Sequence, residues 1–264
     1  MFGLKDKVAI ITGCGNNKGI GYAIAKGYAQ EGAKLVLADI CPLENMEALV
    51  PSLKELGAQD VLCVRTDVSS EESVEEMLKA TVDRFGTVDI LVNNAGVMRV
   101  KELLELTVAD WDLPYNVMLK GTFLCTKVVG KFMKEKGIKG KIINMSSVGG
   151  KRPWVYSAAY CAMKAGIVSL TQVSASVLAK YGINVNGIAP GDHKTDMLEI
   201  CYSQGAKIDG ISQEQFEKNA IAGIPIGHVG TTEDIANMAC YLASPMADFI
   251  VGQVMNVNGG VVMQ

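Results

Sequence analysis

The stretch Thr12-Gly13-Cys14-Gly15-Asn16-Asn17-Lys18-Gly19-Ile20-Gly21 follows a short apolar run, Lys7–Thr12, and leads into an Ala-rich segment. In that segment Ala23, Ile24 and Tyr28 recur at helical spacing, so the local order is strand, glycine-rich loop, helix. Glycines serve tight turns for steric reasons alone. Between a first strand and a first helix, however, they also let the backbone approach a pyrophosphate, whose charge meets the free N–H groups of the helix start. The loop therefore predicts an α/β fold with a phosphate site.

The alternation of strand and helix continues along the chain. Short β-branched or apolar runs occur at Lys7–Thr12, Lys34–Asp39, Asp60–Thr66, Val88–Asn93, Lys141–Ser146, Ile183–Ile188 and Gln253–Val257. Each of the first six is followed by a segment of helix length. Strands that alternate with helices form parallel sheets covered on both faces. We expect a Rossmann-like, doubly wound α/β fold with a parallel sheet of about seven strands and helices on both faces.

No internal repeat or Pro/Ser-rich linker divides the chain, so we expect one dinucleotide-binding domain over residues 1–264. The segment from about Asp192 to Pro225 differs from the rest, because it lies between the sixth strand and an expected helix, Thr231–Ala243, and is mixed in composition. Long insertions of this kind often act as lids. We expect a substrate lid at about 192–225, the alternative being a surface excursion without function.

Composition restricts the class of protein. Hydrophobic residues make up 49% of the 264 residues, which is enough for a substantial core. The net charge of −3 is spread out, without the basic stripe of a nucleic-acid-binding protein. We find no apolar run of the roughly 20 residues that cross a bilayer and no signal-peptide pattern, so we expect a cytoplasmic protein without membrane association. The seven cysteines lack CxxC spacing and the two histidines lack spaced carboxylates, so no disulfide framework and no metal site are expected.

Asp39 ends the second strand, about twenty residues beyond the glycine loop. A carboxylate at this place can accept hydrogen bonds from the adenosine ribose of a dinucleotide. Lys18 could instead favour a 2′-phosphate. A phosphate with nearly two negative charges beside Asp39 costs several kcal/mol, however, and one flexible lysine recovers less. We therefore predict NAD rather than NADP as the cofactor.

Tyr160 and Lys164 are four residues apart in a segment that opens a helix after the fifth strand. On a helix they share one face, and a lysine cation beside a phenol lowers the phenol pKa from its usual value near 10. Proton transfer by Tyr160 then comes closer to neutral pH. A lone Tyr-x-x-x-Lys is common by chance, and Tyr156 lies one turn earlier on the same stripe, so this pair needs support from other residues.

Further motifs supply that support. They are Asp67-Val68 after the third strand, Asn93-Asn94-Ala95-Gly96 after the fourth, Ser147 thirteen residues before Tyr160, and Pro190-Gly191-x-x-x-Thr195-x-Met197 after the sixth. Together with the glycine loop, Asp39 and Lys164, they make nearly the whole chain resemble the short-chain dehydrogenase/reductase family. The resemblance implies an NAD(H)-dependent enzyme that transfers a hydride between nicotinamide and a secondary alcohol or ketone.

The resemblance also implies roles for the matching residues. The serine that matches Ser147 hydrogen-bonds the substrate oxygen, the tyrosine that matches Tyr160 exchanges its proton, and the lysine that matches Lys164 lowers the tyrosine pKa and binds ribose. Ser146 and Ser147 should point to opposite sides of the strand end, so we assign this role to Ser147. Cofactor contacts are expected from Gly13, Asn17, Gly19, Ile20, Asp39, Asp67, Val68, Asn94, Ala95, Gly96, Tyr160, Lys164, Pro190, Gly191 and Thr195.

Two departures from the family pattern are visible. Five residues rather than three follow Gly13 before Gly19, so we expect the phosphate loop to bulge near Asn16-Asn17. The second departure is Met118, which aligns with the catalytic asparagine of the family. A thioether cannot donate a hydrogen bond. Asn116 is about 200° away on a regular helix, so it faces elsewhere unless the helix is distorted. We hypothesise that Ser147, Tyr160 and Lys164 suffice, with protons leaving by another route.

The substrate is less constrained than the reaction. Met98, Trp154, Tyr156, Met197 and Leu198 would form an apolar pocket for a cyclic or steroid-like alcohol, which we favour. The basic residues Arg99, Lys101, Lys151, Arg152 and Lys194 would instead suit a polyol, a sugar alcohol or an anion. We expect substrate contacts from Met98, Ser147, Trp154, Tyr160, His193 and Met197.

Two further expectations concern activity and assembly. Met118 leaves open a catalytically idle relative that binds NAD and senses redox state. The ending Gly252–Gly260 resembles the strand region through which family members form tetramers, so we expect a homotetramer and no nucleic-acid partner.

Overall fold

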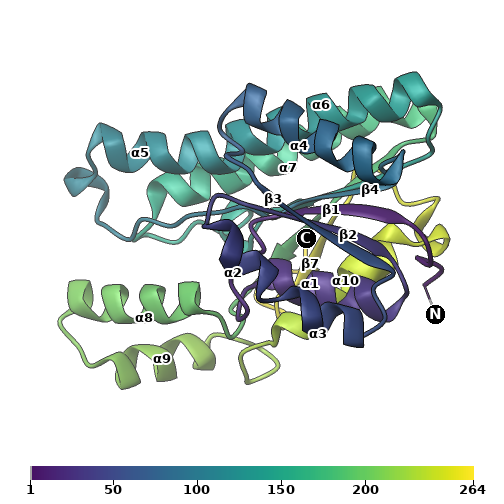
Figure 1. Ribbon diagram of the computed structural model, residues 1–264. Coiled ribbons are helices and arrows are strands. Elements are labelled where there is room, and N and C mark those ends of the chain that lie inside the picture. The colour runs from purple at the N-terminus through teal and green to yellow at the C-terminus, as the bar shows by residue number, and fades with distance from the viewer. Residues whose placement is uncertain (1) are drawn as a thin grey trace.

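Seven parallel strands form one sheet in the order β3-β2-β1-β4-β5-β6-β7. They are β1 (Val8–Thr12), β2 (Lys34–Asp39), β3 (Asp60–Arg65), β4 (Ile90–Asn93), β5 (Lys141–Met145), β6 (Asn184–Pro190) and β7 (Val254–Val257). Strand β1 lies between β2 and β4, so the strand order reverses at this point. The computed structural model, which describes residues 2–264, confirms the predicted doubly wound α/β fold (Figure 1).

Helices cover both faces of the sheet (Figure 1). One layer contains α1 (Ile20–Gln30), α2 (Leu43–Glu47), α3 (Val50–Glu55) and α10 (Thr232–Ala243). The other contains α4 (Glu71–Phe85), α5 (Val108–Pro114), α6 (Gly121–Lys136) and α7 (Ala158–Leu178). Short helical turns are η1 (Leu103–Glu105), η2 (Tyr115–Lys120), η3 (Val148–Gly150), η4 (Ala179–Tyr181) and η5 (Pro245–Ala247), of which η2 is a π-helix.

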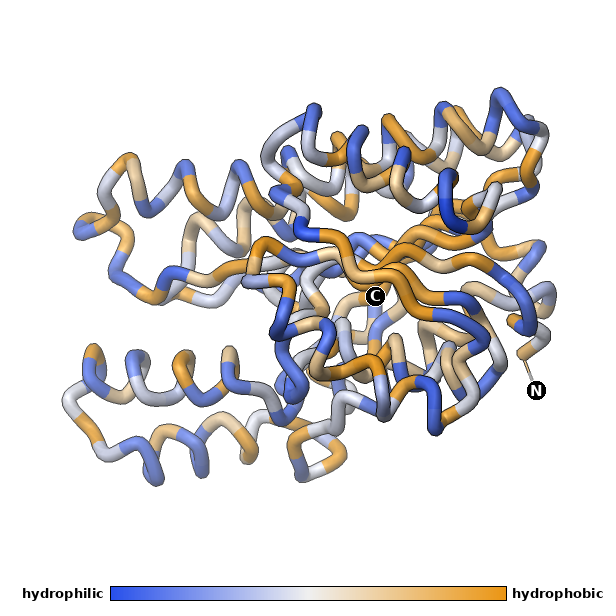
Figure 2. Tube along the Cα trace, viewed as in Figure 1, coloured by the Kyte–Doolittle hydropathy of each residue, from blue (hydrophilic) through white to orange (hydrophobic). Residues whose placement is uncertain are grey.

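The strands are apolar along their length because both of their faces are buried (Figure 2). In β1, Ala9 and Ile11 point into the core under α1 and α10, whereas Val8 and Ile10 point into the core under α4 and α6. This alternation follows from the pleat of a strand. Two separate cores therefore hold the helical layers against one sheet.

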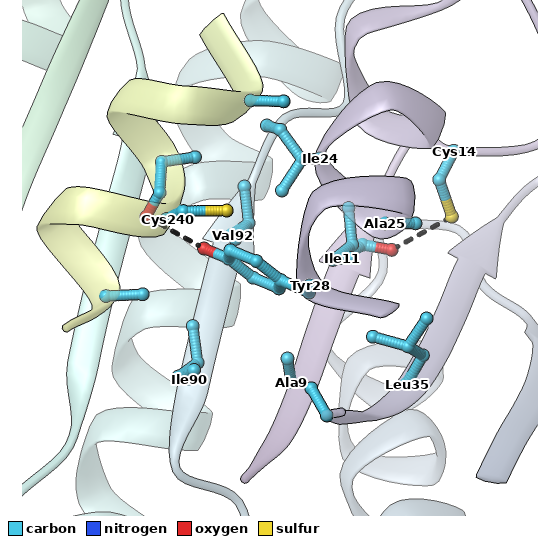
Figure 3. Close-up of a cluster of buried hydrophobic side chains, with 14 of the residues drawn as sticks. Ala9, Ile11, Cys14, Ile24, Ala25, Tyr28, Leu35, Ile90, Val92 and Cys240 are labelled. Atoms are coloured by element: carbon cyan, nitrogen blue, oxygen red, sulfur yellow. Dashed lines mark hydrogen bonds between the residues drawn. The ribbon is translucent and has the colours of Figure 1, made fainter. Parts of the chain in front are cut away.

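Tyr28 joins α1 to α10 within the first of these cores (Figure 3). Its side chain is fully buried, and its hydroxyl donates a hydrogen bond of 3.2 Å to the Ala239 carbonyl. A buried hydroxyl needs such a partner. The contact anchors α1, whose opposite end follows the glycine loop.

The strand boundaries lie within two residues of the predicted ones. The largest differences are in β4, which begins at Ile90, and in β6, which continues to Pro190. Strand β6 is longer because its pairing with β7 persists, and Gly191 N donates a further bond of 3.0 Å to Val257 O. The Pro190-Gly191 motif is therefore fixed at the carboxyl edge of the sheet.

The segment between β6 and α10 forms two helices, α8 (Asp196–Asp209) and α9 (Gln213–Ala222), which project beyond this edge (Figure 1). Gly205 of α8 allows them to pack closely, because a Cβ atom there would lie 2.5 Å from Cζ of Phe216 in α9. The predicted lid segment is thus an ordered helical hairpin.

One segment, Ala158–Tyr181, is long and apolar enough to cross a membrane by length and composition, so the expectation that no run reaches this size is wrong. It comprises α7 and η4. Within this segment Met163, Ile167 and Ala175 are buried against the rest of the protein, and 39% of the apolar window is buried in all.

Candidate active site

A cavity of about 790 Å³ lies beyond the carboxyl ends of the strands. Gly13 after β1, Asp39 at the end of β2 and Asn94 after β4 line one part of it. Ser147 after β5 and Pro190 at the end of β6 line another. Doubly wound sheets bind ligands at this edge, where the strand order reverses.

The glycine loop forms a narrow cradle at one end of the cavity. Gly13 has a left-handed φ of 67°, and a Cβ atom there would lie 2.6 Å from Cα of Ala95. The amide of Asn94 donates bonds of 3.0 and 2.7 Å to the carbonyls of Thr12 and Gly13. Helix α1 begins with no side-chain cap and no acidic residue in its first turn. Its free N–H groups therefore suit an anion.

The lengthened part of this loop turns toward α8. Asn16 Oδ1 accepts a bond of 2.9 Å from Lys18 N, and Asn16 Nδ2 donates a bond of 2.9 Å to Asp196. Lys18 Nζ lies 3.8 Å from the same carboxylate. Asn16 lines the cavity, whereas Asn17, the predicted cofactor contact, is exposed and lies outside the lining. The extra length displaces Asn17 from the position expected for it.

Asp39 is held in place by two backbone amides. Its Oδ2 accepts a bond of 2.8 Å from Gly15 N, and its Oδ1 accepts one of 3.0 Å from Cys41 N. Asp67 and Val68 line the same end of the cavity. Lys18 faces Asp196 rather than Asp39, so it does not neutralise the Asp39 carboxylate.

Ser147, Tyr160 and Lys164 meet in the other part of the cavity. Burial raises the pKa of Tyr160, and a hydrogen bond with Ser147 opposes this effect. Lys164 Nζ lies 5.5 Å from the centre of the Tyr160 ring and donates a bond of 2.6 Å to Met145 O. Burial lowers the pKa of Lys164 to about 8. Ser146 does not contact the Tyr160 hydroxyl in this way; its own hydroxyl donates a hydrogen bond of 2.9 Å to the Lys164 backbone carbonyl.

The helix that carries Met118 is distorted into the π-helix η2. Met118 is fully buried and packs with Met163 and Ile167, with Tyr160 against the cluster. The distortion does not bring Asn116 into the cavity, since Val117 is the residue of η2 that lines it. The position of the family's asparagine therefore holds an apolar side chain.

The predicted substrate contacts Met98, Trp154, His193 and Met197 all line the cavity. His193 is also a structural residue. Its Nδ1 is hydrogen-bonded to Gly191 O at 2.9 Å, and its ring packs so tightly on Gly230 that a Cβ atom there would lie 2.7 Å away. These contacts fix the loop after β6 against the loop before α10.

The sequence analysis named Arg152, which lines the cavity, but it missed several other residues of the cavity wall: Asp192, Tyr202, Asp209, Phe216 and Asn219. Asp192 directly follows the Pro190-Gly191 motif, so its position could have indicated it. Phe216 and Asn219 carry no such signal, because α9 is far away in the sequence and only its packing on α8 brings them to the site.

Aromatic rings connect the loop between η3 and α7 to the helical hairpin of α8 and α9. The Trp154 and Tyr156 rings lie 5.3 Å apart at 80°, Phe216 lies 6.3 Å from Tyr156, and Tyr202 lies 5.9 Å from Phe216. The Tyr156 hydroxyl donates a hydrogen bond to Asp209 at the end of α8. Trp154, Tyr202, Phe216 and Asp209 of this group line the cavity.

Comparison with known proteins places this site in a family. Residues 13–262 match the family model described as Enoyl-(Acyl carrier protein) reductase. Sorbitol dehydrogenase from Cereibacter sphaeroides is 36% identical over 257 residues, which are 97% of this chain and 98% of that enzyme. The crystal structure of levodione reductase has a TM-score of 0.91 at 36% identity, covering 97% of this chain and 98% of that one. The crystal structure of NAD+-bound xylitol dehydrogenase has a TM-score of 0.92 at 29% identity, covering 97% and 99%. The chain belongs to the short-chain dehydrogenase/reductase family of oxidoreductases.

Proposed function

We propose that the protein is an NAD(H)-dependent dehydrogenase that interconverts a secondary alcohol and a ketone. The observation that carries this proposal is that Ser147, Tyr160 and Lys164 share one cavity with Asp39 and the glycine loop. The serine, phenol and lysine amine supply the groups for proton transfer at a substrate oxygen. The loop and the carboxylate supply the groups that bind a dinucleotide.

The cavity residues fit the pyrophosphate and the adenosine ribose of NAD(H). The cradle at Gly13 admits no side chain, the start of α1 is open to a pyrophosphate, and Asp39 presents a fixed carboxylate for ribose hydroxyls. A 2′-phosphate would meet the charge of Asp39, and Lys18 already faces Asp196. The xylitol dehydrogenase relative, described as NAD+-bound, supports the same choice. A higher kcat/KM with NADP(H) than with NAD(H) would contradict it.

Bound NAD+ supplies the hydride acceptor for alcohol oxidation, and NADH supplies the donor for the reverse reaction. In oxidation, Ser147 Oγ binds the substrate oxygen while the Tyr160 phenolate accepts the hydroxyl proton. In reduction, the Tyr160 phenol returns this proton to the carbonyl oxygen. Burial disfavours the phenolate, so the nearby Lys164 cation and the Ser147 hydroxyl have to stabilise it.

The proton must then reach water without help from position 118. Met118 neither donates nor carries a proton, and Lys164 Nζ is bonded to the Met145 carbonyl. We propose that Tyr160 exchanges its proton through the open part of the cavity. A catalytically idle NAD sensor has less support, because every group needed for the reaction lines the cavity.

Two substrate classes fit the cavity. Met98, Trp154, Met197 and Phe216 favour a cyclic or steroid-like alcohol. Polar side chains of the same cavity, Asp192, Asp209 and Asn219, support a polyol instead. Relatives named as sorbitol and xylitol dehydrogenases support the same choice. Turnover with NAD(H) against a panel of cyclic ketones, steroids, polyols and keto sugars tests the proposal. Absence of NAD(H)-linked turnover across the whole panel would contradict it.

We also propose that residues 192–225 form a substrate lid on a single domain and that the enzyme is a cytoplasmic homotetramer. Contacts at both ends of α8 support the lid, namely Asp196 with Asn16 and Asp209 with Tyr156. Exposed apolar side chains around α5 and α6 suit a subunit interface: Leu104, Val108, Trp111, Tyr115 and Phe123. Light scattering at micromolar concentration tests the assembly, and a monomer would contradict it.

A further inference from the structure

Asp192 is a carboxylate fixed in the cavity wall immediately after the Pro190-Gly191 turn. Its backbone carbonyl accepts a bond of 2.9 Å from Gly230 N, and its neighbour His193 bridges to the same glycine. The Tyr202 hydroxyl on α8 donates a bond of 2.9 Å to Asp192 Oδ2. Backbone and side chain are therefore both held in one orientation.

The second oxygen of this carboxylate lacks a protein partner. Among residues 2–264, no hydrogen bond reaches Asp192 Oδ1 and no cation pairs with the carboxylate. Burial raises the pKa of Asp192, and the bond from Tyr202 only partly opposes this effect. A carboxylate removed from water is costly unless donors surround it. The free oxygen is only partly shielded from solvent, so a ligand hydroxyl in the cavity can take the place of water as its donor.

Asp192 lines the same cavity as Tyr160 and Cys201. Its charge contributes to raising the pKa of both of these groups. Asp209 offers a contrast, because it is exposed and already accepts a hydrogen bond from Tyr156. Asp192 thus has a free oxygen that can accept a hydrogen bond from a substrate group in the cavity.

The donor that fits this place is a neutral hydroxyl group. Lys164 and Arg152 line the same cavity, so a cationic substrate would meet like charges. A hydroxyl donates to the free carboxylate oxygen without adding charge, and the Tyr202 oxygen beside it can accept a bond in turn. A purely apolar ring would leave the carboxylate without a donor.

We propose that Asp192, held by Tyr202, is the specificity-determining residue that binds a hydroxyl group next to the reacting carbon. The substrates are then vicinal diols or polyols, and the products are the corresponding hydroxyketones. This inference rests on the proposed function of the same site. It selects between the two substrate classes that the cavity accommodates.

Cyclohexanol and 1,2-cyclohexanediol, in its cis and trans forms, make a matched pair of substrates that differ by one hydroxyl group. With NAD+ and the full-length enzyme, we expect kcat/KM for the better diol isomer to exceed that for cyclohexanol by about ten- to a hundredfold, the range of one hydrogen bond to a charged acceptor. In Asp192→Ala this ratio should fall to about threefold or less. Asp192→Asn, which keeps the shape, and Tyr202→Phe should give intermediate ratios.

Glu199→Gln is the control, because Glu199 is an exposed carboxylate of α8 that does not line the cavity. It should keep the wild-type ratio. Circular dichroism checks that each variant is folded, and Asp192→Asn serves if the alanine variant is not. A wild-type ratio near one, or an unchanged ratio in folded Asp192→Ala or Asp192→Asn, would overturn the assignment.

The same experiment distinguishes a wrong role of Asp192 from a wrong proposed function. Turnover of both compounds without preference contradicts only the role of Asp192. If neither compound is oxidised, tryptophan fluorescence of the NADH-loaded enzyme measures their binding instead, since Trp154 lines the cavity. Tighter binding of the diol that disappears in Asp192→Ala supports the role of Asp192, and equal binding overturns it.

Discussion

Asn16 Nδ2 of the glycine loop donates a hydrogen bond of 2.9 Å to Asp196 Oδ2 in the first turn of α8. This bond joins the glycine loop to the helical hairpin of α8 and α9. Asn16 lines the cavity, whereas Asn17 lies outside the lining. We therefore expect the proposed cofactor site and the position of α8 to be linked through this exposed pair of side chains.

Asn16→Ala should weaken NADH binding by about two- to fivefold, because an exposed hydrogen bond contributes at most about 1 kcal/mol. The melting temperature should change little for the same reason. Fluorescence titration of NADH measures the effect. Asn17→Ala is the matched control, since Asn17 lies outside the cavity lining. An equal loss in both variants would show that the loop length, rather than the contact with Asp196, matters.

Tyr160→Phe should lower kcat by at least about a thousandfold, because it removes the group that accepts and returns the proton. NADH affinity should change by less than about threefold, since the ring and Lys164 remain. Tyr156→Phe, one turn earlier, is the control and should retain most of the activity, because the Tyr156 hydroxyl contacts Asp209 rather than the reacting groups. Full activity of Tyr160→Phe would dismiss its role.

The sequence predicted those features that depend on local pattern. Apolar runs and glycine positions predicted where the strands and the loops between them lie along the chain. The spacing of Ser147, Tyr160 and Lys164 indicated three side chains that meet in one cavity. Features that arise from packing between distant segments were missed. Phe216 reaches the site only because Gly205 lets α9 approach α8.

Two other expectations changed for reasons that spacing cannot reveal. Asn17 was expected at the cofactor, but Asn16 rather than Asn17 lines the cavity. Lysine was expected to dominate the pKa of Tyr160, whereas burial is the largest effect in the structure and raises that pKa. Burial depends on the whole fold, so a four-residue motif does not predict it.

Lys164→Met should abolish turnover and yet stabilise the cofactor-free protein at pH 7 by about 1–3 kcal/mol, because the buried ammonium is costly. Burial lowers its pKa from 10.5 to about 8 in the folded state. Below pH 8 the lysine is charged in both states, so the wild type bears the full cost. Between pH 8 and 10.5 only the unfolded state binds the proton, so wild-type stability rises with pH and the advantage of the variant shrinks.

Thermal unfolding of both proteins from pH 7 to 10 tests this effect. Lys218→Met, at an exposed position of α9, is the control and should leave the pH dependence unchanged. A lower melting temperature of Lys164→Met at pH 7 would show that the bond to Met145 outweighs the cost of burial.

Met118→Asn restores the side chain that the family carries at this position, and it should lower stability without raising kcat. Met118 is fully buried among Met163 and Ile167, so an amide there loses apolar contacts and gains no partner, at a cost of about 2–4 kcal/mol. Lys164 Nζ is already bonded to Met145 O, so the amide would not complete a relay. Met118→Leu, which keeps the volume, should retain both stability and activity. Thermal unfolding and kcat measured side by side decide the matter, because a rise in kcat of Met118→Asn would mean that proton release does depend on position 118.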